Sequence, residues 1–234
     1  MLLMWPWGPA FWTVRAAKRG SRRLNPRFAA FVSGIEAEYG FAPLWVELSP
    51  DNDWLRDGSC LLTIVADRTD QCEAVTQDGY LVPKLSVTRF VRQLFQRTCR
   101  GMTVHGRFGL PRRAVDATRL RVLFSFFEPI AVQKAHESIS GRRLRAFEER
   151  LGLGEMFWCT ASGLREPVVF VHTDEQAAAI RASGLPIAWS DLWYQLVQPF
   201  DEFGYVTRDS IEIRVDSKQN FDDNFESNWR LYGD

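Results

Sequence analysis

Three side chains that follow a predicted buried strand have the types that acid–base catalysis requires. The apolar run of residues 168–171 predicts the strand, and His172 comes directly after it, with Asp174 and Glu175 at the start of the next predicted helix. A histidine beside carboxylates can act as a general base. A hydrolase that uses His172, Asp174 and Glu175 is therefore one alternative for the function.

The same stretch also has a structural explanation, which we favour. Thr173 and Gln176 have the spacing of a capping box, in which two side chains bind backbone amides at the start of a helix. The sequence contains no GxSxG motif that would place a nucleophile on a sharp strand-to-helix turn. The capping box and the missing nucleophile motif together favour a non-catalytic protein, and we predict no catalytic residue.

The C-terminal stretch VDSKQNFDDNFESNWRLYGD is rich in acidic and amide side chains, which are the ligand types of calcium sites. An EF-hand loop starting at Asn220 would need glycine at its sixth position and glutamate at its twelfth, where the sequence has Phe225 and Leu231. The histidines and cysteines lack the regular spacing of a zinc site. We predict neither a metal nor a cofactor.

The aromatic residues of that stretch instead predict a terminal helix. Phe221, Phe225 and Trp229 recur every four residues, so they share one face of a helix from about Phe221 to Tyr232. The opposite face is acidic, and acidic side chains around an aromatic anchor suit a basic partner surface. The predicted binding residues are Glu212, Asp216, Asp222, Asp223, Glu226 and Trp229.

Arginines accumulate in the middle of the chain. Residues 89–150 have a net charge of +9, although the net charge of the whole chain is zero. The loop HGRFGLPRR in this segment matches neither GxxxxGK[ST] nor GxGxxG, so it predicts no nucleotide-binding turn. The basic segment 89–121 still supports a second alternative, a protein that binds or processes nucleic acid. Its candidate residues are Arg97, Arg100, Arg107, Arg112 and Arg113.

The N-terminal segment is apolar first and basic afterwards, the reverse of a secretory signal. Its apolar part is too short to cross a bilayer, and we expect no transmembrane segment. The four cysteines form no CxxC pair, which favours a reducing, cytoplasmic location. Residues 1–24 read as a basic and aromatic extension, as a first helix that packs into the core, or as an amphipathic element for an anionic surface.

Hydrophobic periodicity predicts helices mixed with strands. The clearest helix is NPRFAAFVSGIEAEYG, with Asn25 as its cap and Gly40 after its end. No internal repeat is visible. We predict an α+β fold with a mixed or antiparallel sheet, several helices packed on it and the C-terminal helix docked on the sheet. The predicted strands lie at about 45–48, 59–66, 122–127, 168–171 and 210–216.

The glycines and proline of MTVHGRFGLPRRAVDATR make it the best place for a boundary. We expect residues 25–234 to form one domain of two coupled halves, about 26–105 and 115–234. In the absence of a catalytic or cofactor motif, the favoured function is protein association. One such protein is a cytosolic, bacterial immunity-type protein that neutralises a basic toxin or effector through an acidic aromatic face.

Overall fold

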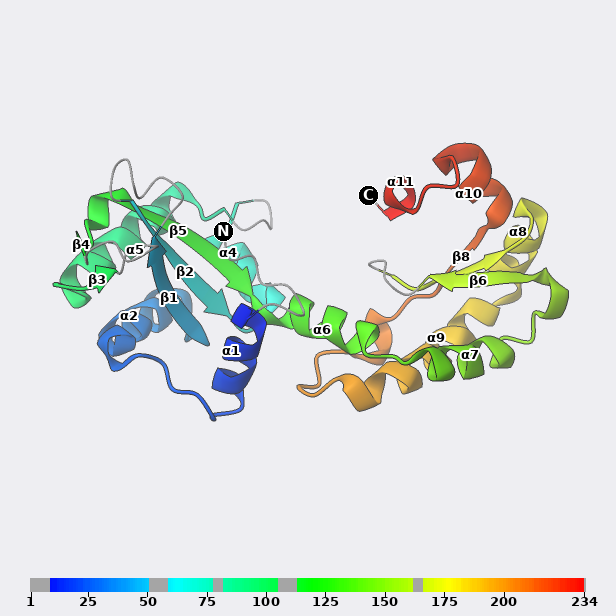
Figure 1. Cartoon of the computed structure of the whole chain (residues 1–234), viewed down its shortest axis with the longest axis horizontal. Coiled ribbons are helices and arrows are strands. Elements are labelled where there is room, and N and C mark those ends of the chain that lie inside the picture. The colour runs from blue at the N-terminus through cyan, green and yellow to red at the C-terminus, as the bar shows by residue number, and fades with distance from the viewer. Residues whose placement is uncertain (1–8, 51–58, 78–81, 105–112, 162–165, 234) are drawn as a thin grey trace. The chain divides into compact units, whose positions relative to one another are not determined.

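The chain forms two compact units, Met1–Ile130 (unit 1) and Ala131–Asp234 (unit 2). The structure is a computed structural model that describes residues 9–50, 59–77, 82–104, 113–161 and 166–233 (Figure 1). Each unit combines a three-stranded mixed sheet with helices, so the predicted α+β class is confirmed. The predicted single domain of two coupled halves stays a prediction. None of the described helices is both long and apolar enough to cross a bilayer.

The sheet of unit 1 has β2 at its centre. β1 (Trp45–Pro50) pairs antiparallel with β2 (Cys60–Ala66), and β2 pairs parallel with β5 (Leu120–Phe126). Because a parallel pair needs a crossover connection, helix α5 (Leu85–Thr98) lies between β2 and β5 in the chain. Every residue of β2 is buried, as expected for a central strand.

The predicted helix at residues 25–40 is confirmed, together with both of its ends. A single 3-10 turn, η1 (Pro26–Phe28), leads into α2 (Ala29–Tyr39), and the Asn25 side chain accepts a hydrogen bond within that turn. Gly40 ends α2 with φ of 76°, a left-handed conformation that costs glycine little.

The core of unit 1 contains a close contact between α2 and α5. A Cβ atom added to Gly34 of α2 would lie 2.6 Å from Leu94 of α5, so the missing side chain permits this approach. The fully buried side chains of this core include Phe31, Ile35, Leu62, Ile64, Phe95, Leu120 and Phe124. The shorter elements of unit 1 are η2 (Thr69–Gln71), α4 (Cys72–Val75), β3 (Thr103–Val104), β4 (Arg113–Ala114) and η4 (Ala117–Arg119).

Helix α1 (Pro9–Lys18) is held on unit 1 by a ring pair and an ion pair. The ring of Phe11 stacks on that of Phe127 with centroids 5.5 Å apart. The Nζ atom of Lys18 lies 2.6 and 2.7 Å from the two carboxylate oxygens of Asp67. The predicted N-terminal extension therefore contains a packed helix, and its residues 1–8 lie outside the described part of the chain.

Unit 2 repeats the strand arrangement of unit 1. β6 (Phe157–Ala161) pairs antiparallel with β7 (Val168–Val171), and β7 pairs parallel with β8 (Arg214–Ser217). The strand order and directions match those of β1, β2 and β5, a repeat that the sequence analysis missed. The helices that reach or belong to unit 2 are α6 (Phe127–Glu137), α7 (Gly141–Arg150), α8 (Asp174–Ser183), α9 (Leu185–Val197), α10 (Lys218–Phe225) and α11 (Trp229–Gly233), with 3-10 turns η5 (Gly154–Met156), η6 (Gln198–Phe200) and η7 (Arg208–Ser210).

The central strand β7 contributes to two separate apolar clusters. Val169 and Val171 belong to a cluster that is filled by α7, α8 and α9. Val168 and Phe170 alternate with them along the strand and belong to a cluster that includes Phe221 of α10. The C-terminal helix therefore docks on the sheet, as predicted.

The last helix differs from its prediction, because it is broken in two. Glu226 and Ser227, between α10 and α11, both have φ of 54°, which is uncommon for residues with a Cβ atom. The amide of Asn228 donates to the carbonyl of Phe225 across this turn at 2.8 Å. A continuous helix over 221–232 is therefore wrong, although its rings still gather in one cluster.

The core of unit 2 surrounds Trp193, whose side chain is fully buried. Its indole nitrogen donates to Nδ1 of His136 at 3.3 Å, and its ring meets that of Phe147 edge-on at 5.0 Å. Nδ1 can accept only while the imidazole is neutral. Burial lowers the pKa of His136, although the charge of Asp201 opposes this effect.

We expect unit 2 to lose stability as the pH falls from about 8 to about 5. The unfolded chain binds a proton at His136 near the ordinary histidine pKa of about 6.5, whereas the folded chain binds it only at lower pH. The stabilisation by neutral His136 is therefore complete well above pH 6.5, and it is lost as the pH falls from there through the lower pKa of the folded chain. Thermal unfolding at a series of pH values measures it, with His136→Gln as the variant that keeps an acceptor without titrating. His172→Gln, at an exposed position, is the control, and an unchanged pH profile in His136→Gln would contradict the assignment.

On the side of β8 that faces away from β7, backbone groups form hydrogen bonds with side chains. The Arg214 amide bonds toward β7, so Ile213 and Val215 direct their backbone groups to the open edge. The Ile213 amide donates to the Ser190 hydroxyl at 3.1 Å, and the Val215 carbonyl accepts from Arg181 at 2.9 Å.

Candidate functional site

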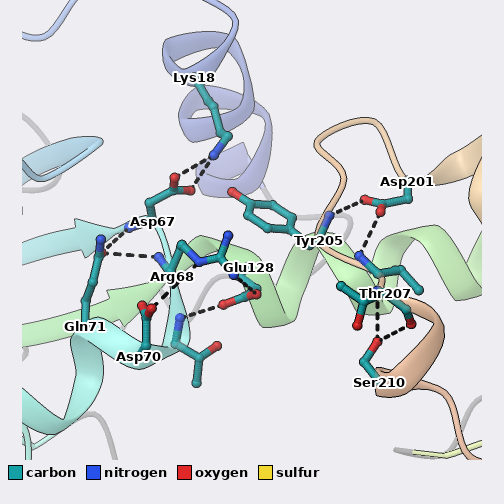
Figure 2. A network of polar contacts seen from close by, with 12 residues as sticks. Lys18, Asp67, Arg68, Asp70, Gln71, Glu128, Asp201, Tyr205, Thr207 and Ser210 are labelled. Carbon is teal, nitrogen blue, oxygen red and sulfur yellow. Dashed lines mark hydrogen bonds and ion pairs between the residues drawn. The ribbon is translucent and has the colours of Figure 1, made fainter.

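A polar turn lies at the carboxyl ends of the parallel strands β2 and β5 of unit 1 (Figure 2). The amides of Asp67 and Arg68 donate to the Gln71 side chain at 3.0 and 3.2 Å. The Thr69 amide donates to the Glu128 carboxylate at 2.6 Å, and the Glu128 amide donates to the Asp67 carbonyl at 2.9 Å. Ligands of parallel sheets usually bind beyond this end of the strands, so the turn is the first place to look for a site.

Unit 2 has the same turn at the carboxyl ends of β7 and β8. The amides of His172 and Thr173 donate to the Gln176 side chain at 3.1 and 3.0 Å. The Asp174 amide donates to the Gln219 side chain at 3.4 Å, and the Gln219 amide donates to the His172 carbonyl at 3.2 Å. Every bond has its counterpart in unit 1, so the turn is a structural feature of the repeated unit.

The carboxylates of the turn in unit 1 are paired with cations of the same unit. Figure 2 shows Lys18 between both oxygens of Asp67. The Nε atom of Arg68 lies 3.9 Å from a carboxylate oxygen of Asp70, and its Nη2 atom lies 3.8 Å from a carboxylate oxygen of Glu128. In the described parts of the chain, no three His, Cys, Asp or Glu residues are placed to hold a metal ion. These charges therefore connect α1, the turn and the start of α6. Sequence reasoning missed the pairs of Lys18 with Asp67 and of Arg68 with Glu128 because the partners are far apart in the chain.

The acid–base alternative of the sequence analysis concerns three residues at the start of α8, and no hydrogen bond between their side chains is present among the described residues. Asp174 accepts a hydrogen bond from the Ser217 hydroxyl, which connects the start of α8 to the end of β8. His172 and Glu175 are exposed, and neither side chain has a described partner. The capping box of Thr173 is present as predicted. Thr173 and Asp174 therefore support the start of α8.

The candidate site is an acidic surface in unit 2, which contains the predicted binding residues. Two of these residues, Glu212 and Asp216, line a groove of about 510 Å³ beside β8. Glu212 is exposed and has no partner among the described residues. The full lining is Arg181, Pro186, Glu212, Ile213, Arg214, Val215, Asp216 and Asn220.

Asp216 is held by neighbouring side chains. The hydroxyl of Tyr232 donates to its carboxylate at 2.6 Å, and the amide nitrogen of Asn220 lies 3.0 Å from each carboxylate oxygen. Arg214 donates to the Tyr232 oxygen at 2.9 Å. Burial and the bond to Asp216 raise the pKa of Tyr232, so the phenol stays protonated and remains a donor. Asp216 therefore organises the groove and is not free for a partner.

Of the acids of α10 and of the turn after it, one is paired and two have no side-chain partner among the described residues. Asp222 pairs with Lys218 one turn earlier and accepts from the Ser227 hydroxyl at 2.6 Å, and these bonds lower its pKa. Asp223 and Glu226 are exposed and have no described side-chain partner. These two carboxylates are therefore the ones available for an incoming cation.

Trp229 is an exposed ring on a rigid support. The Trp229 side chain is 44% exposed. Its ring centroid nevertheless lies 4.3 Å from that of Phe221, and the ring stacks on Trp158 with centroids 5.9 Å apart. It also meets the buried ring of Phe170 edge-on at 5.4 Å. A ring that is already immobilised loses little entropy when a partner covers it.

The two units carry opposite charges. Unit 1 has 18 Lys and Arg residues and 12 Asp and Glu residues, whereas unit 2 has 11 and 17. Their net charges are therefore +6 and −6. The zero charge of the whole chain thus conceals one basic and one acidic copy of the same architecture.

The other predicted residues fall in unit 1. Arg97 and Arg100 are exposed on and just after α5, and Arg107 and Arg112 lie outside the described residues. Arg113 begins β4, where its side chain is not described.

No protein-family model, no curated protein and no solved structure matches this chain. Function is therefore inferred below from charge, exposure and side-chain geometry within each unit.

Proposed function

We propose that this protein is a non-catalytic binding protein whose acidic unit 2 covers a basic surface of another protein. The observation that carries the proposal is the combination of Trp229, exposed but packed against other rings, with the carboxylates of Asp223 and Glu226, which have no side-chain partner among the described residues. Aromatic anchors surrounded by charge are typical of the residues that dominate protein interfaces.

The charge of unit 2 indicates the chemistry of the partner. A net charge of −6 attracts a basic protein at long range, and Trp229 supplies apolar area at the contact. An immunity-type protein that neutralises a basic toxin or effector in the bacterial cytosol fits this description. The groove lined by Glu212 is the second part of the proposed interface.

The test compares two variants with equal changes of charge. Asp223→Lys/Glu226→Lys reverses the proposed contact, and Glu175→Lys/Asp209→Lys reverses two exposed acids elsewhere in unit 2. Affinity capture from extracts of the source cell is expected to recover a stoichiometric partner with wild type and with the second variant. Association of the first variant with the purified partner is expected to be at least about tenfold slower at low salt.

Equal association rates for the two variants would refute the proposed contact. Trp229→Ala supplies an independent measurement, because it removes the aromatic anchor without a change of charge. We expect it to accelerate dissociation about tenfold or more, as truncation of an interface anchor does. Circular dichroism of every variant establishes that the fold is retained.

A further inference from the structure

The exposed face of α5 in unit 1 has an unusual composition. Residues 79–115 contain eight Lys and Arg residues and no Asp or Glu. A solvated helix usually mixes both signs of charge, because opposite charges three or four residues apart stabilise it. The exposed side chains of this face are Arg89, Gln93, Gln96 and Arg97 of α5, together with Arg100 just after the end of the helix.

These side chains are opposite the buried face of the helix and are unengaged. Val87, Val91 and Phe95 pack into the core, whereas the arginines and glutamines recur on the other side at spacings of three and four residues. None of the five has a hydrogen bond or ion pair within the described parts of the chain. Arg92 differs, since its Nε atom donates to the Leu120 carbonyl at 2.8 Å.

A groove of about 370 Å³ runs along this face. On the side opposite the helix it is bounded by Ala117 and Thr118 of η4. The nearby carboxylate of Asp116 is engaged, because it accepts from both the amide and the hydroxyl of Thr118. The lining is Leu85, Thr88, Arg89, Arg92, Gln93, Gln96, Ala117 and Thr118.

From these features we propose that the exposed face of α5 binds the phosphate backbone of a nucleic acid. Arginine presents a planar fork of donors that matches phosphate oxygens, and the side chains of Arg89, Arg97 and Arg100, which have no partner among the described residues, can each meet a phosphate. Glutamine both donates and accepts, which suits sugar and base edges. An acidic protein segment is the competing ligand, because Leu85 and Ala117 also line the groove, and the test below separates it from nucleic acid.

The proposal concerns unit 1 and is independent of the protein-binding surface in unit 2. It is tested with the full chain by fluorescence anisotropy, using labelled single-stranded RNA and double-stranded DNA of about 20 nucleotides and a polyglutamate peptide of equal charge. Binding to nucleic acid is expected at about 50 mM salt, with log K falling linearly as log salt rises.

Two variants remove three arginines each. Arg89→Gln/Arg97→Gln/Arg100→Gln changes the α5 face, and Arg142→Gln/Arg143→Gln/Arg145→Gln changes exposed arginines of α7 in unit 2. The α5 variant is expected to bind at least about tenfold more weakly and to lower the salt slope by about two to three. The α7 variant is expected to stay within about twofold of wild type.

Three results would overturn the proposal. They are no binding to either nucleic acid at low salt, equal weakening in the two variants, and polyglutamate bound as tightly as nucleic acid. The last result would show that the face recognises acidic protein segments instead. Whether RNA or DNA binds more tightly identifies the natural ligand once the α5 variant has weakened both.

Discussion

Replacing Trp193 with alanine is expected to reduce the free energy of unfolding of unit 2 by about 3–5 kcal/mol. The side chain is fully buried, so the substitution leaves a cavity among the side chains that Trp193 contacts, including Phe147. It also leaves Nδ1 of His136 without its donor. Urea unfolding followed by circular dichroism measures the loss, and hydrogen exchange at the β7 amides assigns it to unit 2.

Trp229→Ala is the matched control for this prediction. It makes the same change of residue in the same unit, but at a side chain that is 44% exposed. Less apolar area returns to water, so we expect a loss of about 1–2 kcal/mol. Equal losses in the two variants would mean that Trp193 does not occupy the centre of the core.

Phe221→Ala is expected to destabilise unit 2 by about 3 kcal/mol and to release the C-terminal helices from the sheet. Its buried ring contacts Phe170 of β7, Trp158 of β6 and Trp229 of α11, so it connects both helices to the sheet. Hydrogen exchange at the amides of α10 and α11 is expected to accelerate more than exchange in α9. Because the acidic surface depends on α10, association with the proposed basic partner is expected to weaken as well.

The control for Phe221 is Phe225→Ala, one turn further along α10. Phe225 is only partly buried and lies beside Tyr232 with centroids 4.8 Å apart. We expect a smaller loss, near 1 kcal/mol, because part of its ring already faces water. A larger loss for Phe225 than for Phe221 would show that α10 docks through a different face.

The elements that were predicted well depend on neighbouring residues in the chain. The Thr173–Gln176 capping box, the Asn25 cap and the Gly40 end of α2 are all present, because a cap involves residues only two to four positions apart. The buried strand at 168–171 was also predicted at its exact bounds. The strand predicted at 210–216 instead runs from Arg214 to Ser217, because Ser210 belongs to the 3-10 turn η7 and residues 211–213 lie between the two elements.

The repeat could not be read from the sequence, because the donors in its turn are backbone amides, which nearly every residue possesses. In the turn of unit 1 the backbone amides of Asp67 and Arg68 donate to a glutamine side chain. In unit 2 the backbone amides of His172 and Thr173 do the same. Only the glutamine that accepts from them is the same residue type in both units. The break in the last helix was also missed, since Glu226 and Ser227 are not residues that favour a left-handed conformation.

The candidate acidic surface was predicted in part. The pairing of Asp222 with Lys218 follows from their four-residue spacing and was available from the sequence. The bond from Tyr232 to Asp216 was not, because it joins β8 to α11. Of the predicted residues, the structure leaves Glu212, Asp223 and Glu226 as exposed carboxylates without a described partner.

The side chains that cover the edge of β8 decide how another chain can meet unit 2. Arg181 donates a hydrogen bond to the Val215 carbonyl, and the Ile213 amide donates one to the Ser190 hydroxyl. An incoming strand would have to break these hydrogen bonds before it could pair with β8. Natural proteins protect exposed sheet edges in comparable ways against uncontrolled strand addition and fibre growth. These hydrogen bonds therefore disfavour the addition of another strand to the sheet of unit 2 at this edge. A protein that binds on this side would contact side chains instead of the backbone.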